Sequence, residues 1–181
     1  MRSYKIESII LKRRNTGEAD RIVTIFTKKQ GKMHIKAVGV RRVTSRRSPH
    51  IEPLNRSILT LYKGGGMPVL IEAQTIEHFS VIKNDLTRDG FAYHLCELID
   101  GLCPEGAENQ QVFTMFYQTL LRLCLNPSNI LSVVREFEAS LLIMLGYWPV
   151  HKPLANLDTK YMLENILERK LKANKIFSSL L

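Results

Sequence analysis

The sequence predicts an α+β protein in which a small N-terminal β-barrel is followed by an all-α helical domain. From Tyr4 to Thr75, apolar residues alternate with polar ones, which is the period of β-strands. After Asn84 the apolar residues recur every three or four positions, which is the period of helices. Positive charge is concentrated in the strand-rich part. These observations predict two domains, residues 1–80 and residues 81–181.

Five short strands are expected in the first domain. Glycines at 31, 39 and 64–66 fall between them, where a positive φ is easiest for a residue without Cβ. Five strands in so short a stretch favour a closed barrel, because closure removes the exposed sheet edges. The predicted strands are residues 6–11, 21–27, 32–38, 57–62 and 69–75.

The third strand alternates most clearly. Its two sets of residues are Met33, Ile35 and Ala37 against Lys32, His34 and Lys36. We expect the first set to enter the core and the second to present cations to solvent. The cationic face is a candidate anion surface, and the alternative is a solvated edge whose lysines block aggregation.

Four helices are expected in the second domain. Pro104 and Gly106 end the first, and Asn126 followed by Pro127 ends the second, because proline cannot continue a helix. Ser128 or Asn129 is the candidate cap of the third, and Gly146 ends it. The predicted helices are residues 86–103, residues 109–125, a third from residue 128 or 129 to Gly146, and a fourth capped by Asp158.

Composition favours a cytoplasmic protein. The longest apolar run, residues 141–148, is interrupted by Gly146 and is far shorter than the roughly 20 residues that span a bilayer. The first 14 residues lack the pattern of a signal peptide. Cys96, Cys103 and Cys124 form no C-x-x-C pair, so we interpret them as small apolar residues inside helices.

The basic charge indicates a polyanionic partner. Residues 1–63 carry 16 Lys and Arg against 4 Asp and Glu, whereas residues 91–181 carry 8 against 9. The densest cluster is residues 41–47, between the third and fourth strands. With no nearby acidic partner before Glu52, this loop should stay extended and solvated until a polyanion binds. Arginine forks bind phosphate, and hydroxyls such as that of Ser45 add contacts without sequence information.

Nucleic acid is the simplest polyanion of matching extent. An anionic lipid surface is a weaker candidate, because no amphipathic basic helix is present. Aromatic residues are scarce in this half, so contacts with the phosphate backbone should dominate over base recognition. Lys12 adds to the charge, and the candidate DNA-binding residues are Arg13, Arg14, Lys28, Lys29, Lys32, Lys36, Arg41, Arg42, Arg46 and Arg47.

Signals for catalysis are lacking. We interpret Glu18 and Asp20 as a polar turn between strands, and Glu136 and Glu138 should point to different sides of a helix. The triple glycine at 64–66 lacks the Lys and Ser or Thr of a phosphate loop, and the histidines show no metal-ligand spacing. We therefore expect no enzyme, no catalytic residue, no metal, no cofactor and no small-molecule substrate.

Several motifs resemble the bacterial recombination mediator RecO family. In chain order they are GEADRIVTIFT at 17–27 followed by Gly31-Lys32, AVGVRR at 37–42 with Ser45-Arg46, LTLYKGGG at 59–66, REFE at 135–138, LGYWP at 145–149, and Lys170-Leu171-Lys172 with Phe177. The likeness covers most of the chain in the right order.

The resemblance implies an OB-fold barrel followed by an α-helical domain, in a nucleoid-associated bacterial protein of the RecF pathway. It implies binding of single- and double-stranded DNA, annealing of complementary strands and loading of recombinase on strands covered by single-stranded DNA-binding protein. The implied protein partners are RecR and the acidic, apolar C-terminal tail of the single-stranded DNA-binding protein. Arg122 and Arg135 could pair with that tail, and the alternative is that both are plain surface charges.

One departure from the family pattern stands out. Many members carry a zinc-binding insertion with four cysteines soon after the Gly-Tyr-x-Pro segment, but here no cysteine follows Pro149. We therefore expect a short form without that insertion. Two other functions remain open, a basic RNA-binding module and a protein-interaction scaffold with an acidic partner.

Overall fold

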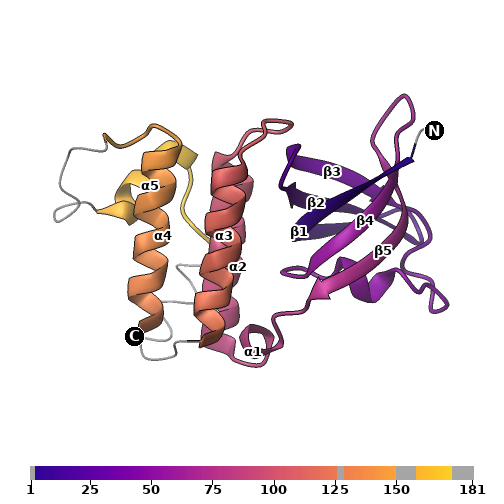
Figure 1. Cartoon of the computed structure of the whole chain (residues 1–181), viewed down its shortest axis with the longest axis horizontal. Helices are drawn as coiled ribbons and strands as arrows, with labels where there is room; N and C mark the ends of the chain where they lie inside the picture. The colour runs from indigo at the N-terminus through magenta and orange to yellow at the C-terminus, as the bar shows by residue number, and fades with distance from the viewer. Residues whose placement is uncertain (1–2, 126–128, 150–157, 173–181) are drawn as a thin grey trace. The chain divides into compact units, whose positions relative to one another are not determined.

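The computed structural model describes residues 3–125, 129–149 and 158–172, and their contacts group into two compact units (Figure 1). The first unit holds the strands up to Phe79 together with Cys103–Phe113. The second begins with Ser80–Leu102 and resumes at Thr114. The units thus interleave along the chain, where the sequence predicted a single boundary after residue 80.

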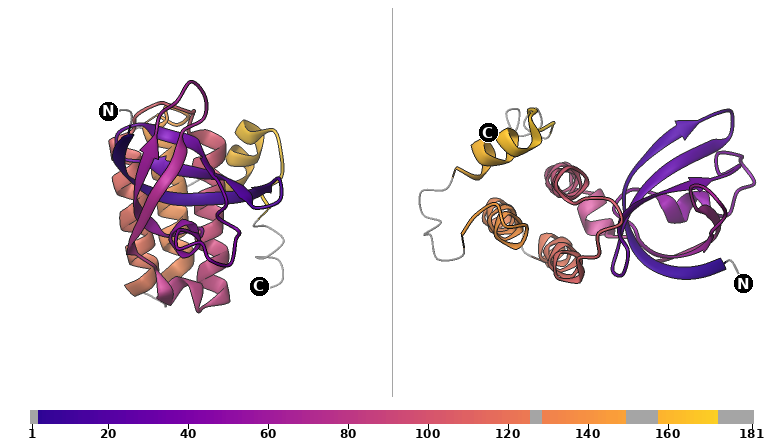
Figure 2. Two further views of the ribbon diagram at one scale, coloured as in Figure 1. Left: turned by 90° about the vertical axis from the view of Figure 1, so that its right-hand side faces the viewer. Right: turned by 90° about the horizontal axis from the view of Figure 1, so that it is seen from above.

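The first unit is a closed five-stranded barrel, and Figure 2 shows its strands curling round into a ring. Neighbouring strands are antiparallel, except that β3 and β5 are parallel where Lys36 faces Val69. The strands pair in the order β1-β2-β3-β5-β4, an arrangement consistent with an OB-fold. Their bounds are β1 (Ser3–Thr16), β2 (Asp20–Thr27), β3 (Gly31–Ala37), β4 (Arg56–Tyr62) and β5 (Val69–Glu77).

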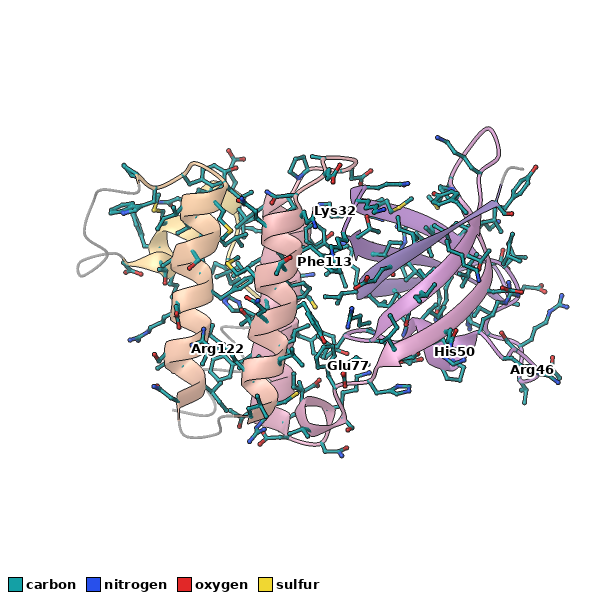
Figure 3. The ribbon with its side chains drawn as sticks, viewed as in Figure 1. Lys32, Arg46, His50, Glu77, Phe113 and Arg122 are labelled. Carbon is teal, nitrogen blue, oxygen red and sulfur yellow. The ribbon has the colours of Figure 1, made fainter. Side chains whose placement is uncertain are left out.

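Alternating apolar residues fill the barrel, which confirms the predicted strand pattern. Ile35 and Ala37 are fully buried and Met33 packs against the same core. The core is closed by the short 3-10 helix η1 (Ser48–Ile51), which the sequence did not predict and which inserts Ile51. The Nδ1 atom of His50 (labelled in Figure 3) accepts the amide hydrogen of Thr75 at 3.2 Å and so ties η1 to β5.

Part of the outer face of β2 and β3 is covered by Cys103–Phe113. Phe26, which alternates with the inward residues of β2, packs against Phe113 with ring centroids 5.9 Å apart. The amide of Gly106 donates to the carbonyl of Lys32 at 2.9 Å. Lys32 is consequently only 9% exposed. The prediction that its side chain faces solvent was wrong, because a segment distant in sequence lies over it.

The second unit is helical, with α2, α3 and α4 running side by side (Figures 1 and 2). Asn129 and Asp158 precede α4 and α5 as predicted. The Asp158 carboxylate accepts the Tyr161 amide hydrogen at 3.0 Å, whereas the Asn129 side chain makes no capping hydrogen bond. Gly146, with φ +80°, follows the end of α4 as predicted. The helices are α1 (Ser80–Lys83), which the sequence did not predict, α2 (Leu86–Leu102), α3 (Gln110–Leu125), α4 (Ile130–Met144) and α5 (Thr159–Leu167).

Polar contacts hold the helices together. His94 of α2 lies 2.6 Å from the Glu138 carboxylate of α4, which also accepts the Thr159 hydroxyl of α5 at 2.5 Å. The guanidinium of Arg88 donates to the carbonyl of Leu123 at 3.1 Å, near the end of α3. These hydrogen bonds of His94 Nε2, Glu138 and the Arg88 Nη1 atom link the helices and stabilise their packing.

Three sequence predictions fall outside the described residues. They are the break at Asn126-Pro127 with the alternative cap Ser128, the segment from Val150 where the zinc-binding insertion is expected to be missing, and the family likeness at Phe177.

Candidate nucleic-acid interface

The pairing of β1, β2 and β3 builds two rows of side chains on the outer face of the barrel. Residues directly opposite one another on neighbouring strands project from the same face. The rows are Lys12, Thr24 and His34, and next to them Arg14, Ile22 and Lys36. The residues between them in sequence, such as Val23 and Ile35, point into the core. The outer face therefore collects cations from β1 and β3, on either side of the uncharged Ile22 and Thr24 of β2.

A register shift between Ile10 and Lys12 sets this pattern on β1. Because of it, Lys12 and Arg14 share the outer face and Arg13 shares the inner face with Val23. Arg13 forms an ion pair with Glu52 at the edge of the core. Its charge is therefore partly matched, by a carboxylate that also lies 3.8 Å from Arg21, although the sequence placed Arg13 among the DNA-binding candidates.

Asp20 organises the end of this face. Its carboxylate accepts the amide hydrogen of Gly39 at 2.8 Å and lies 3.2 Å from the Lys36 ammonium. The hydrogen bond from Gly39, helped by the charges of Lys36 and Arg42, holds the pKa of Asp20 below its ordinary value of 3.8. The carboxylate thus fixes the turn after β3 and leaves Lys36 with a partner.

The arginine loop, residues 41–47, is folded rather than extended. The Ser45 amide donates to the Arg42 carbonyl at 2.9 Å in a turn, so the prediction of an extended loop was wrong. Residues 41–44 and Arg46 are nevertheless exposed, as the prediction of a solvated loop requires. Arg47 donates to the carbonyls of Leu70 and Val38 at 2.7 and 2.8 Å. Arg47 therefore fastens the loop to the barrel, and its guanidinium donors are engaged by these carbonyls rather than available to an anion.

The other arginines of the loop stay at the surface. The Arg41 guanidinium makes a single exposed contact, 3.4 Å from the Gly17 carbonyl. Arg42 and Arg46 are exposed, and among the described residues their side chains form no hydrogen bond or ion pair. Figure 3 shows Arg46 pointing away from the barrel. These three arginines can meet a phosphate without giving up a strong contact.

Lys28 and Lys29 lie in the turn between β2 and β3, at the far end of the strands from the arginine loop. The structure thus sorts the ten candidates. Four are tied up or buried: Arg13, Lys32, Lys36 and Arg47. Six remain at least partly exposed with their charges available: Arg14, Lys28, Lys29, Arg41, Arg42 and Arg46.

A cavity of about 270 Å³ opens on the same face. Sequence reasoning did not place Thr24, His34 and Met67 at one site. Strand pairing brings the first two together, with the Thr24 hydroxyl 2.9 Å from His34 Nδ1. Met67 comes from the β4–β5 connection, and no local motif signals its position. The lining residues are Lys12, Arg14, Ile22, Thr24, His34 and Met67.

The two partner-binding candidates of the helical unit differ. Arg122 already lies 2.6 Å from the Glu136 carboxylate, and both side chains are exposed. Arg135 is exposed on α4, and its side chain forms no hydrogen bond or ion pair with the described residues. Glu136 and Glu138 do point to different sides of α4, one to solvent and one to buried His94.

The described ranges hold no ready-made metal cluster. Across them, His, Cys, Asp and Glu nowhere gather in a group of three or more that could hold a metal ion. None of the described helices combines the length and apolar character needed to cross a bilayer.

Two family models match the chain, one for each part. Residues 1–79 match the model described as "Recombination protein O N terminal", and residues 83–152 match "Recombination protein O C terminal". The matches follow one another in the order of the two parts of the chain.

Individual relatives agree. The chain is 32% identical over 150 residues to "DNA repair protein RecO" of Pelotomaculum thermopropionicum, covering 83% of this chain and 58% of that protein. The protein of the same name from Roseiflexus sp. is 37% identical over 148 residues, covering 82% and 52%. That of Dehalococcoides mccartyi is 34% identical over 157 residues, covering 87% and 62%. The chain therefore spans between half and two thirds of the length of these relatives.

Proposed function

The chain belongs to the recombination protein O family, and from this we propose that it is a DNA repair and recombination mediator. In this proposal the barrel binds single- and double-stranded DNA, and the bound strands are annealed to complementary ones. The protein helps to load recombinase onto strands covered by single-stranded DNA-binding protein. It acts by binding, without making or breaking bonds, at the nucleoid in the bacterial cytoplasm.

The observation that carries the proposal is the basic outer face of β1–β3 with the adjoining arginine loop. Six candidate cations on this face, on the arginine loop and in the β2–β3 turn keep their charges available. Most hydrogen bonds of proteins to DNA go to phosphate and sugar, which such cations can meet. The exposed arginines suit bidentate phosphate contacts. Such contacts position a strand without reading its sequence, as a protein that anneals any complementary pair requires.

The helical unit is proposed to hold protein partners, namely RecR and the acidic tail of single-stranded DNA-binding protein. Arg135 is the better candidate for the tail, because its exposed charge has no partner among the described residues, whereas Arg122 is paired with Glu136. The acidic tail would meet an arginine beside exposed Leu131 on the same helix.

The decisive experiment is annealing of complementary strands precoated with the cognate single-stranded DNA-binding protein. We expect the chain to accelerate annealing of the coated strands, because a mediator must act on them. The double substitution Arg42→Ala and Arg46→Ala should slow this reaction several-fold, since it removes two exposed phosphate contacts. Glu18→Gln, an exposed change in the β1–β2 turn, is the matched control and should leave the rate unchanged.

Two results would count against the proposal. Acceleration of naked strands alone would indicate plain DNA binding without mediation. A clear preference for RNA over DNA strands of matched sequence would favour an RNA-binding module instead, since only the 2′-hydroxyl distinguishes the two backbones.

A further inference from the structure

We propose that the cavity beside Met67 receives one unpaired base of a single strand, while Arg14 and Lys12 hold the phosphate next to it. The inference rests on the proposed function, because it names the part of the DNA that this site takes. It goes beyond phosphate contacts, which by themselves would not require a cavity.

The residues that line the cavity complement the chemistry of a nucleotide. Two cations, Lys12 and Arg14, line it from β1, and two apolar side chains, Ile22 and Met67, line it from β2 and the β4–β5 connection. Arg14 is exposed, and its side chain forms no hydrogen bond or ion pair with the described residues. A ligand that satisfies both sets must carry an anionic group beside an apolar ring.

The size of the cavity indicates a single base. Pockets that take whole small molecules start at roughly 300 Å³, and this cavity of about 270 Å³ lies just below that range. It therefore suits a single base. A base in a duplex is held between its stacked neighbours and would have to flip out to enter, so the site favours an unstacked base of a single strand.

Backbone contacts of the residues next to Met67 fix its position at the side of the cavity. The carbonyl of its neighbour Pro68 accepts the Lys36 amide hydrogen at 2.8 Å, and Val69 pairs with Lys36 across the parallel β3–β5 contact. The side chain is nevertheless 43% exposed, which leaves an apolar thioether at the mouth of a basic pocket. Methionine sulfur makes favourable contacts with aromatic rings, so a base bound in the cavity would be stabilised by packing against the Met67 thioether.

The polar atoms of Thr24 and His34, which line the cavity, already have partners within the protein. His34 Nδ1 lies 2.9 Å from the Thr24 hydroxyl, and His34 Nε2 lies 2.6 Å from the Glu105 carboxylate. With both nitrogens engaged, the imidazole offers its ring rather than a hydrogen bond. The cavity should therefore accept any base by shape and stacking, as sequence-tolerant single-strand sites do.

The test uses Met67→Ala in the full chain, with Ile71→Ala as control. Ile71 lies on the same hairpin, has the same 43% exposure and does not line the cavity. Affinities are measured by fluorescence anisotropy for a normal single strand, for a strand of abasic sugar phosphates and for duplex. Thermal melting confirms that both variants fold.

We expect Met67→Ala to weaken binding of the normal single strand by about two- to tenfold. Its affinity for the abasic strand and for duplex should stay unchanged, and so should the salt dependence, because no charge is removed. Ile71→Ala should bind all three like the unaltered chain.

Unchanged single-strand affinity of Met67→Ala, or an equal loss for the abasic strand, would overturn the proposal while leaving the DNA-binding function intact. An equal loss with Ile71→Ala would do the same, since it would place the apolar contact outside the cavity. Absence of DNA binding by the unaltered chain would overturn the proposed function, and the base site with it.

Discussion

Asp20 shows how a single acidic residue shapes a basic surface. Its predicted role was that of a polar turn residue, and it does lie at the β1–β2 turn. Its main contacts, however, are with Lys36 at the far end of β3 and with Gly39 just beyond that strand. A contact across that separation has no local signature. The turn could therefore be predicted, whereas the loss of Lys36 as a free cation could not.

The pKa of Asp20 predicts how stability depends on pH. Because the pKa is lower in the folded chain than its ordinary 3.8, mainly through the Gly39 amide, the carboxylate stabilises the fold above about pH 4. This contribution is lost as pH falls through the folded pKa. We expect Asp20→Asn to unfold at a lower urea concentration at pH 7, with the difference from the unaltered chain shrinking below about pH 4.

Urea titrations between about pH 2.5 and pH 7 measure this effect. Glu18→Gln is again the control, since Glu18 lies in the same turn and its exposed side chain forms no bond within the described residues. A difference that stays constant down to the lowest pH would show that the Asp20 carboxylate does not hold the turn.

The elements themselves could largely be predicted from periodicity. Strands β2 to β5 and helices α2 to α4 lie close to their predicted ranges, and α5 follows its predicted cap Asp158, because alternation and capping act locally. The first strand, β1, is longer than the predicted residues 6–11 and extends from Ser3 to Thr16. The covering of β2 and β3 by Cys103–Phe113 could not be predicted. This covering depends on contacts between residues far apart in sequence, such as Phe26 and Phe113. The same covering buries Lys32.

Gly31 tests the covering segment. It has φ +63°, and a Cβ there would lie 1.9 Å from the Ala107 carbonyl oxygen. We expect Gly31→Ala to lower the free energy of unfolding by more than the roughly 1–2 kcal/mol that a positive φ costs a residue with a side chain. The Gly106 amide, which donates to Lys32, should also exchange its hydrogen faster, because the segment must move away.

Gly17→Ala is the matched control for the backbone strain. Gly17 has φ +55°, and no atom lies within 4 Å of the position that a Cβ would take, so its substitution should cost only the strain. Denaturation curves of the two variants give the comparison. Equal losses would mean that residues 105–107 do not pack against β3.

At the scale of the whole molecule, the division of charge follows the division into strand-rich and helical parts. The formal net charge is +9, and the six DNA-binding candidates whose charges remain available all lie in the strand-rich unit. The amount of charge could be predicted from the sequence, but its availability depended on which carboxylates and carbonyls the fold brought near. Neither Glu52 beside Arg13 nor the carbonyls around Arg47 lie close in sequence.

The six available cations predict the salt dependence of binding. If all six meet phosphates, the logarithm of the affinity for single strands should fall with the logarithm of salt concentration at a slope of about −4, from about 0.7 for each contact. Alanine at Arg42 and Arg46 should reduce the magnitude of the slope by about 1.4, and alanine at Lys28 and Lys29 by the same amount.

The two pairs lie at opposite ends of β2 and β3, so equal losses would mean that the bound DNA strand runs the length of the outer face. Arg13→Ala should reduce the magnitude of the slope by less than the roughly 0.7 of a full phosphate contact, because Glu52 is paired with Arg13 although it also lies 3.8 Å from Arg21. A slope near zero would contradict phosphate binding altogether, and a loss confined to the arginine pair would end the strand's path before the β2–β3 turn.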